Sequence, residues 1–515
     1  MSRSTSSERA RVASDRTGDA AGRFDVVVLG AGVVGCAVAR WLGRETCSTA
    51  VLEKGSDVGG GASSRNSGVI HSGVNYTPGT RRATLCMEGR ALLEAWCGEL
   101  NVPIRRCGKL IVAQRESERP MLQRLLEQGQ ANGVPGVQIV TGAQAATLQP
   151  GIRCVAALHV PSTSIVSPYA ATIAMAEDAA SNGVHFFLDH RITEIEPDEE
   201  GFAVWTERGS FHARAIVNCA GIYASELARC LTPDAPPQYP CAGEYLLLDK
   251  QAGESLRMAV YPAPHAGGAG LGVHITPTTE GNVLLGPSNE YVEEVETDGT
   301  TQVVADTLLG EAKAMWPDVP ERWVIGSYAG IRPKLTPPEI GGFSDYILLR
   351  TEAHPRALHL LGIESPGLTA APALARLVVE DFLRPLLGFA PKPSADVRVR
   401  RWPTRFDELP EREKEHAVAE NPDHGEIVCR CEGVTRAEVL HALDNPLRVR
   451  TLAGIKFRSR AMMGRCSGGY CLPRIVAMLQ DEYGVRPEAI QLRGPSSPAF
   501  VGPLLEEGDP DARNA

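Results

Sequence analysis

The chain lacks the features that mark a membrane-spanning or exported protein. No stretch reaches the roughly 18 uninterrupted apolar residues of a transmembrane helix, and residues 1–22 contain no apolar core of signal-peptide length. Acidic residues also outnumber basic ones, since 62 Asp and Glu against 52 Lys and Arg give a formal net charge of -10. This balance argues against a nucleic-acid partner and supplies no polybasic membrane anchor. We expect residues 1–22 to be a disordered tail and the protein to be cytoplasmic, with peripheral membrane contact left open.

Internal repeats are absent, and a disulfide framework is not expected. The 13 cysteines, an odd number, are spread over 515 residues without an export signal. This distribution favours reduced thiols and cofactor ligands. The chain is too long for one hydrophobic core, so we expect two or three domains.

The apolar runs predict an α/β fold that begins with a βαβ unit. Residues 24–30 (FDVVVLG) suit a buried parallel strand, residues 33–44 a helix and residues 49–53 the next strand. The same sheet gains strands from distant segments, which we predict at 184–189, 213–218 and 358–362, with a helix at 370–382. An antiparallel substrate domain is indicated by strand-like pieces between Gly, Pro and Thr turns, at 244–250, 283–286 and 346–350.

These patterns give a domain plan in which a nucleotide-binding domain is interrupted by the substrate domain. The nucleotide-binding parts are about 24–100, 160–235 and 325–383, and the substrate parts are about 101–159 and 236–324. Proline and charge then rise, which predicts a linker over 384–425, a small helical module over 426–485 and a tail over 486–515.

Gly30, Gly32 and Gly35 form a Gly-x-Gly-x-x-Gly pattern where the first strand turns into the first helix. Such glycines allow a tight turn, approach of the backbone to a pyrophosphate and close packing of helix on strand. Glu53 ends the second strand 23 residues after Gly30, where a carboxylate can bind ribose hydroxyls. A structural turn is the alternative. The long Gly/Ser/Asn-rich segment 54–80 favours FAD over NAD, because it can approach an extended flavin.

A second redox signal is the motif C-x-C-x34-C-x4-C, made by Cys429, Cys431, Cys466 and Cys471. The Gly-Gly pair inside the second half lets backbone amides point at sulfur, and such N–H bonds tune an iron-sulfur cluster. A structural zinc site, for which C-x2-C spacing is usual, and spare thiols are the alternatives. The helix expected after the first pair carries a capping box at Thr435 and Glu438.

Nine segments between residues 24 and 382 resemble, in order, those of the D-amino-acid oxidase-like FAD superfamily. More narrowly they are similar to the group of L-2-hydroxyglutarate oxidases and glycerol-3-phosphate dehydrogenases or oxidases. The segments are SSRNSGVIHSGVNY, CGKLIVA, PSTSIV, IVNCAGIYAS, GEYLLLD, LGVHITPT, VLLGPS, AGIRPKL and GIESPGLTAAPALA. The cysteine motif resembles the bacterioferritin-associated-ferredoxin-like [2Fe-2S] domain, which also follows the flavoprotein domain of anaerobic glycerol-3-phosphate dehydrogenases.

The resemblance implies a Rossmann-like FAD-binding domain and a set of cofactor contacts. Its adenosine and pyrophosphate contacts fall on Gly30, Gly32, Gly35, Glu53 and Lys54, and its flavin contacts fall on Ser64, Ser67, Ala220 and Gly221. The turn from Gly362 through Gly367 and Leu368 to Thr369 is expected over the isoalloxazine.

Two histidines and a pair of cations are the candidates for chemistry and recognition. His71, between small residues on the presumed flavin loop, and His274, on a strand, are expected to face the substrate. If His71 is the base, flavin reduction is expected to rise with pH through the histidine range. Arg332 and Lys334 flank Pro333 in a stiffened turn and suit an anionic group, and Tyr245 is an expected pocket wall.

Together these features predict an FAD-dependent dehydrogenase with a fused [2Fe-2S] domain. The expected substrate is a small anionic secondary alcohol, glycerol 3-phosphate or a 2-hydroxy acid such as L-2-hydroxyglutarate, and the expected electron acceptor is a quinone or a protein. An amine or amino-acid dehydrogenase and an electron-transfer or iron-handling flavoprotein without its own substrate are the alternatives. The substrate, the acceptor, the mode of FAD attachment and the oligomeric state stay open.

Overall fold

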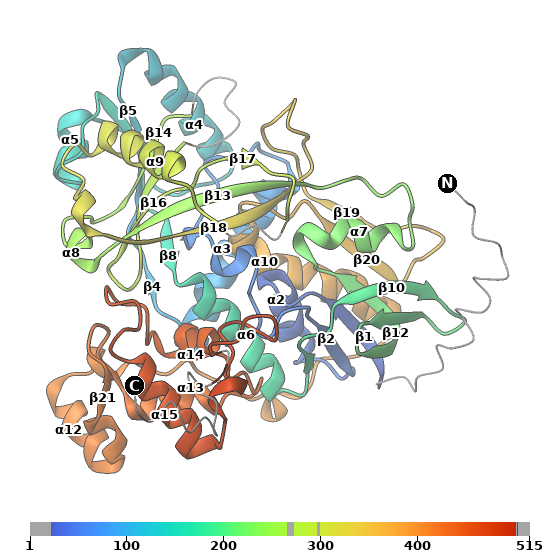
Figure 1. Ribbon diagram of the computed structural model, residues 1–515. Coiled ribbons are helices and arrows are strands. Elements are labelled where there is room, and N and C mark those ends of the chain that lie inside the picture. Colours follow the sequence, from blue (N-terminus) through green and yellow to red (C-terminus); the bar gives the residue numbers. More distant parts are fainter. Residues whose placement is uncertain (1–21, 265–271, 296–298, 501, 503–515) are drawn as a thin grey trace.

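The computed structural model describes residues 22–264, 272–295, 299–500 and 502, which form three packed parts (Figure 1). The tail expected at residues 1–22 lies outside these residues, except for Gly22, which begins the first strand. Within the described ranges, no helix has the length and apolar character needed to cross a bilayer.

An eight-stranded sheet forms the nucleotide-binding domain, and its central strands are parallel as predicted. Residues 26–29 at its centre are fully buried, because β-branched and leucine side chains suit a strand covered on both faces. The strands run in the order β10 (Ile192–Pro197), β11 (Phe202–Thr206), β12 (Gly209–Asn218), β1 (Gly22–Leu29), β2 (Thr49–Leu52) and β9 (His185–Phe187), with β20 (Ala357–Leu361) beside β12 and β19 (Ile347–Leu349) beside β20.

Helices from distant segments cover one face of this sheet and form its largest core. They are α2 (Val33–Leu42), α3 (Arg81–Leu100), α6 (Pro168–Ser181) and α10 (Gly367–Arg376). The predicted helix over 370–382 is α10 continued by a π-helical segment, Leu377–Leu383. The expected strand at 346–350 is β19 and belongs to this sheet, because it pairs with β20 and not with the substrate domain.

A nine-stranded sheet forms the substrate domain above the first (Figure 1). It is antiparallel except for one parallel pair, β5 with β14, whose strands come from the two separate substrate segments. The order is β17 (Glu290–Tyr291), β13 (Tyr239–Leu248), β16 (Val283–Gly286), β15 (His274–Pro277), β14 (Ala259–Pro262), β5 (Lys109–Ala113), β7 (Ala156–Val160) and β6 (Gln138–Thr141), with β18 (Val324–Lys334) on the other edge of β13.

Strand β18 corrects two sequence-based expectations. It pairs with β13 along the length of both strands, so residues 324–334 belong to the substrate sheet and not to the nucleotide-binding part assigned from 325 onward. The segment with Arg332 and Lys334 is therefore a strand, where a stiffened turn was expected.

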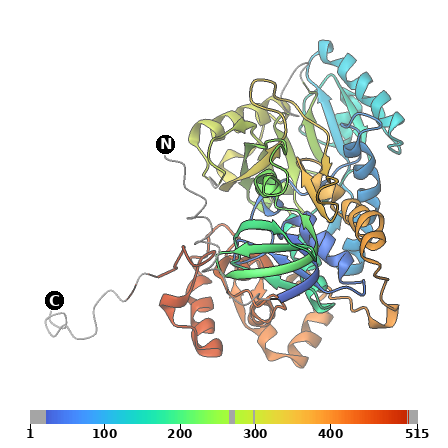
Figure 2. The same cartoon turned by 90° about the vertical axis from the view of Figure 1, so that its right-hand side faces the viewer.

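The C-terminal domain is small and mostly helical, as predicted, and it lies against both other parts (Figures 1 and 2). Its elements are β21 (Ile427–Cys429), β22 (Val434–Thr435), α13 (Arg436–Leu443), α14 (Leu452–Ser459) and α15 (Leu472–Tyr483). The capping box of Thr435 and Glu438 is confirmed. Ile490 is buried in this core, so residues 486–500 are a packed part of the domain and not a tail. The expected linker contains helices as well, the longest being α12 (Glu411–Glu420).

Two buried arginines join this domain to the rest of the molecule. Arg458 of α14 donates to Asp57, at 2.6 and 3.0 Å, and to Glu177, at 2.8 Å. Arg460 donates to the Tyr169 hydroxyl at 2.7 Å and is also held by Glu432 of its own domain, at 2.9 Å. Buried charges that are paired in this way are costly to expose or break, so these contacts fix the position of the domain.

Candidate active site and cofactor sites

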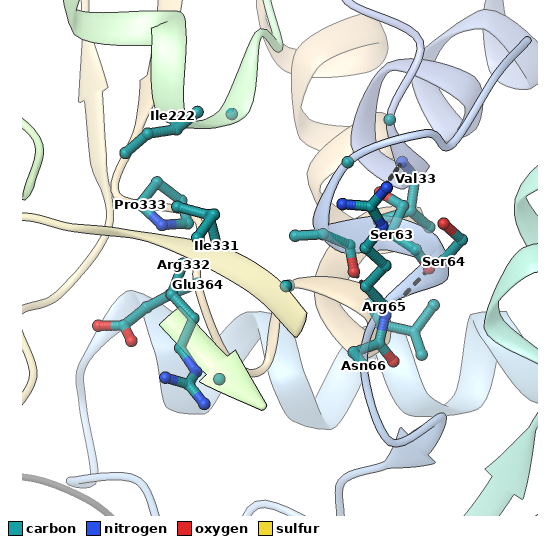
Figure 3. Close-up of a pocket in the computed structure, with 18 of the residues that line it drawn as sticks. Val33, Ser63, Ser64, Arg65, Asn66, Ile222, Ile331, Arg332, Pro333 and Glu364 are labelled. Atoms are coloured by element: carbon teal, nitrogen blue, oxygen red, sulfur yellow. Dashed lines mark hydrogen bonds between the residues drawn. The ribbon is translucent and has the colours of Figure 1, made fainter. Parts of the chain in front are cut away.

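A cavity of about 1530 Å³ lies where the three parts meet. Its wall is formed by the glycine loop after β1, the segment after β2, strands β14 and β18, and residues of α14. Figure 3 shows Arg332 and Glu364 on one side of this space and the segment from Ser63 to Asn66 on the other. Pockets for drug-sized ligands measure roughly 300–1,000 Å³, so this one suits an extended cofactor together with a substrate.

The glycine loop has the backbone geometry that the fingerprint requires. Gly30 has a φ of +94°, and a Cβ placed there would lie 2.9 Å from the Ala220 Cα. A Cβ on Gly35 would lie 2.0 Å from the Gly30 carbonyl oxygen, which leaves only glycine room for the helix to pack against the strand. Gly30 and Gly32 line the cavity, whereas Gly35 supports the loop from behind.

Glu53 lies at the cavity wall beside the glycine loop. Its carboxylate accepts hydrogen bonds from the backbone amides of Ala31 and Gly55, both at 2.8 Å, and burial raises its pKa. A carboxylate offers about four acceptor positions, so it keeps capacity for ribose hydroxyls. Lys54 also lines the cavity and donates to the Tyr223 hydroxyl at 2.8 Å. These residues fit the adenosine half of FAD.

The residues expected along the flavin divide into a lining set and a supporting set. Ser64, Ser67, Ala220, Gly221, Gly367 and Leu368 line the cavity. Gly362 and Thr369 do not line it, but each forms a hydrogen bond with a neighbouring residue. Gly362 has a φ of +70° and donates its amide to the Gln238 side chain at 2.6 Å. The Thr369 hydroxyl accepts from the His71 amide at 3.0 Å and so ties the helix start to the flavin loop.

His71 lies in the cavity wall next to that tie. Its Nε2 atom is 3.3 Å from the Ser365 hydroxyl, and its Nδ1 atom is buried without a hydrogen-bond partner. Burial, followed by the nearby charges of Lys109 and Arg82, lowers the pKa of His71 to about 3. The imidazole is therefore neutral at physiological pH, as a proton acceptor must be. The ionisation in the ordinary histidine range that the sequence suggested does not fit this environment.

His274 and Tyr245 line the same cavity as His71, from two strands of the substrate sheet. His274 of β15 stacks on Tyr261 of β14, with ring centroids 3.5 Å apart. Tyr245 of β13 stacks on Tyr328 of β18 at 5.0 Å, and burial raises its pKa. The substrate sheet thus presents an aromatic wall to the cavity.

Arg332 brings a fixed cation to the cavity. Its guanidinium donates to the backbone carbonyls of Ala242, at 3.0 Å, and Ser288, at 2.8 Å. Gly243 makes room for it, because a Cβ there would lie 2.2 Å from the Arg332 Nη2 atom. The Nη1 atom also lies 3.4 Å from the Asn289 side-chain oxygen and 3.5 Å from the Cys241 sulfur. Arginine has five N–H donors, so donors remain for an anion.

Lys334 does not share this role, which corrects the expectation of a paired cation site. Its side chain is fully buried outside the cavity lining, and its ammonium donates to the Gly342 carbonyl at 2.6 Å. The same ammonium lies 3.4 Å from the Glu364 carboxylate. Its charge is therefore neutralised within the protein.

Glu364 and Lys109 are charged groups near the site that the sequence reasoning did not single out. Glu364 lines the cavity, and burial raises its pKa despite the neighbouring Lys334. Lys109 is fully buried, its Nζ atom has no hydrogen-bond partner, and desolvation lowers its pKa to about 8. The sequence does mark both residues as unusual. Glu364 is the only charged residue in GIESPGL, and Lys109 is the only charged residue in CGKLIVA.

The four motif cysteines lie in the C-terminal domain as two pairs. Cys431 and Cys466 are exposed, with their sulfur atoms 3.5 Å apart, whereas Cys429 and Cys471 are buried. A hydrogen bond from the Cys471 thiol, assisted by backbone amides of Met462 and Glu432, lowers the pKa of Cys429 to about 6. Backbone amides of Tyr470 and Gly468 likewise lower the pKa of Cys466. No three His, Cys, Asp or Glu side chains converge as a metal site in the described residues, but thiolates stabilised by amides are the donors that an iron-sulfur cluster uses.

The fold and these sites define a two-cofactor redox enzyme, and comparisons with known proteins agree. Residues 25–381 match the family model described as FAD dependent oxidoreductase. Residues 427–481 match the model of the BFD-like [2Fe-2S] binding domain. The chain belongs to the FAD dependent oxidoreductase family and carries a [2Fe-2S]-binding domain at its C-terminal side. The resemblance seen in the sequence is thereby confirmed.

Individual relatives narrow the type of enzyme. A glycerol 3-phosphate dehydrogenase from Caloramator mitchellensis is 34% identical over 94% of this chain and 99% of its own length. A mitochondrial L-2-hydroxyglutarate dehydrogenase from Arabidopsis thaliana is 32% identical over 70% of this chain and 84% of its own. Among solved structures, FAD-bound L-α-glycerophosphate oxidase from Mycoplasma pneumoniae superposes with a TM-score of 0.67 at 30% identity, covering 73% of this chain and 98% of the other. The chain is therefore an FAD-dependent oxidoreductase of the glycerol-3-phosphate or L-2-hydroxyglutarate dehydrogenase type.

Proposed function

We propose that this protein is a dehydrogenase that oxidises glycerol 3-phosphate or an L-2-hydroxy acid such as L-2-hydroxyglutarate and passes the electrons through its [2Fe-2S] domain to a quinone or protein acceptor. Glycerol 3-phosphate is the first candidate, because the relative that matches nearly the whole chain, C-terminal domain included, carries that name.

The observation that carries the proposal is the single cavity that joins two kinds of residue. One end of the cavity is lined by the glycine loop and Glu53, which suit a dinucleotide. The other end is lined by the candidate substrate residues, His71, His274, Tyr245 and Arg332. A substrate held by the second set therefore lies against a cofactor held by the first. FAD held by the glycine loop and Glu53 would supply a hydride acceptor there, and a cluster held by the four motif cysteines would take up electrons one at a time.

Arg332 and His71 divide the work on the substrate. Arg332, anchored by two carbonyls, presents its remaining N–H groups to the phosphate or carboxylate. The neutral His71 imidazole accepts the proton of the substrate hydroxyl. Its pKa of about 3 makes it a weak base in the unliganded site, and the negative charge of a bound substrate raises that pKa. Substrate binding thus makes His71 a stronger base for the proton transfer.

A substrate panel scored by anaerobic bleaching of the flavin absorbance tests this function. Glycerol 3-phosphate and L-2-hydroxyglutarate are compared with glycerol, which lacks the anion, and with glycine and L-proline, which are amino acids. We expect bleaching by at least one of the two anionic alcohols and none by glycerol at the same concentration. Bleaching by an amino acid alone would replace the proposal with an amino-acid dehydrogenase.

A further inference from the structure

The cysteine motif has one buried side and one exposed side. Cys429 and Cys471 are buried in the core of the C-terminal domain, whereas Cys431 and Cys466 reach the surface. The neighbouring Glu432 is buried and joined to Arg460, at the contact with the other domains. The exposed pair therefore lies where a second molecule can approach the cluster ligands.

Three arginines lie next to this exposed pair. Arg430 and Arg465 directly precede Cys431 and Cys466 in the sequence, and Arg474 lies over the same Tyr470 ring as Arg430. Arg430, Arg465 and Arg474 are all exposed, and we call them the arginine rim. The guanidinium groups of Arg430 and Arg474 lie 4.5 and 4.7 Å from the centre of the Tyr470 ring. Arg465 is 3.5 Å from Asp249 and its side chain remains 63% exposed. Neither Arg430 nor Arg474 forms an ion pair with a carboxylate in the part of the chain that the structure describes.

The sign of this patch is opposite to that of the whole chain. The formal net charge is -10, yet the three exposed arginines next to the thiols are cationic. The carboxylates nearby, Asp249 and Glu432, are mostly buried and paired with Arg465 and Arg460. Tyr470 holds two of the arginines in place, because guanidinium groups are attracted to aromatic faces. Charges of one sign around a small contact patch steer a partner of the opposite sign into a defined orientation.

We propose that the arginine rim is the docking surface for an acidic electron-carrier protein, which takes electrons from the exposed side of the cluster. This inference rests on the proposed function only in assigning the cluster an outgoing electron. An anionic membrane is the less suitable partner, because recognition of lipid by charge uses clusters of about four to eight cations, and the arginine rim has three. Oxidation of one substrate molecule releases two electrons, so it reduces two molecules of a one-electron carrier.

Native and succinylated cytochrome c provide matched probes, because both carry the same haem while succinylation replaces lysine cations by carboxylates. The full-length protein, loaded with both cofactors, is reduced photochemically without substrate and mixed with each ferric cytochrome in low salt. We expect the succinylated form to bind and be reduced faster by at least about tenfold, and this advantage to vanish as salt rises above the screening range.

The charge reversals Arg430→Glu and Arg474→Glu are expected to remove the preference for the succinylated form. Arg208→Glu, in the exposed turn between β11 and β12 of the nucleotide-binding sheet, is the matched control and is expected to keep it. Iron content and visible absorbance show whether each variant retains its cluster. Arg474 lies outside the cysteine motif, so this variant decides the outcome if Arg430→Glu loses iron.

Three results would overturn the proposal. The first is an equal preference for the two cytochromes in the wild type. The second is an unchanged preference in Arg474→Glu with the cluster intact. The third is arginine-dependent sedimentation with phosphatidylglycerol vesicles but no binding of succinylated cytochrome c, which would assign the rim to a membrane. Because none of these measurements uses a substrate, their failure is distinct from a failure of the substrate panel.

Discussion

Replacing Lys334 by methionine should destabilise the fold rather than weaken substrate binding. Methionine fills a similar volume but removes the cation that lies 3.4 Å from Glu364, and both side chains are almost completely buried. Breaking a buried ion pair by removing one partner costs about 3 to 5 kcal/mol, because a charge is left uncompensated. Glu364 can escape part of this cost by taking up a proton, since burial already raises its pKa.

The sign of the pH dependence follows from that raised pKa. A carboxyl group whose pKa is higher in the folded state favours folding when it is protonated, so the deficit of Lys334→Met shrinks as pH falls from about 8 to 5. Urea unfolding, followed by circular dichroism at several pH values, measures this deficit. The double variant Lys334→Met/Glu364→Gln removes both charges and is expected to recover most of the stability.

Arg332→Gln is the matched control in the same strand. It is expected to weaken substrate binding by about 2 to 4 kcal/mol, measured by anaerobic flavin bleaching, with a smaller effect on stability. The reasoning fails if Lys334→Met is as stable as the wild type and instead loses affinity for the substrate to the same extent as Arg332→Gln. In that case Lys334 contacts the anion, as the sequence suggested.

Three further outcomes follow from the site and the domain contacts. His71→Asn should lower the rate of flavin reduction by about 10²- to 10⁴-fold with FAD retained. In the wild type at low substrate concentration, where the second-order rate constant reports the free enzyme, protonation of His71 should not slow reduction between about pH 7 and 5, because the pKa of His71 is lowered to about 3 in the unliganded site. A rise of this second-order rate constant through the histidine range in stopped-flow traces would contradict the expectation. Cys466→Ser should lose iron and acid-labile sulfide but keep substrate-dependent bleaching, and zinc bound by the wild type after anaerobic preparation would contradict the cluster assignment. Arg458→Gln should destabilise the protein by about 3 to 5 kcal/mol and increase the loss of FAD on gel filtration. A variant that keeps both its FAD and its stability would show that the Arg458–Asp57 ion pair does not hold the cofactor loop in place.

Local patterns predicted those parts of the structure whose chemistry is local. The glycine fingerprint predicted the turn because Gly30 and Gly35 meet each other and Ala220 within one βαβ unit and its neighbouring strand. The capping box at Thr435 was visible for the same reason, since both partners lie within four residues of each other. His71 and Arg332 reach one cavity from separate domains, which only the family resemblance could suggest.

The errors concern contacts between residues far apart in the sequence. Arg332 and Lys334 are two positions apart on β18 and carry the same charge, so the sequence treated them alike. Their difference comes from Glu364, on a separate segment, which pairs with Lys334 and leaves Arg332 to the cavity. The role of β18 itself was missed because its partner β13 lies on another segment. The charge and spacing of the two residues do not show which of them is already paired with a carboxylate.

Residues of the C-terminal domain line the cavity that fits FAD. This, too, depends on contacts between residues far apart in the sequence. Thr451, Ala453 and Phe457 line the cavity from the start and the inner side of α14. The first amides of that helix are already bound by the carbonyls of Gln491 and Leu492, so they are not an anion site, and the helix acts as a wall. Arg458 of the same helix holds Asp57, which lies four residues after Glu53, the residue expected to bind the ribose. Movement of the [2Fe-2S] domain would therefore disturb the loop that is expected to bind the adenosine half of FAD, so the Arg458–Asp57 contact connects the two expected cofactor sites.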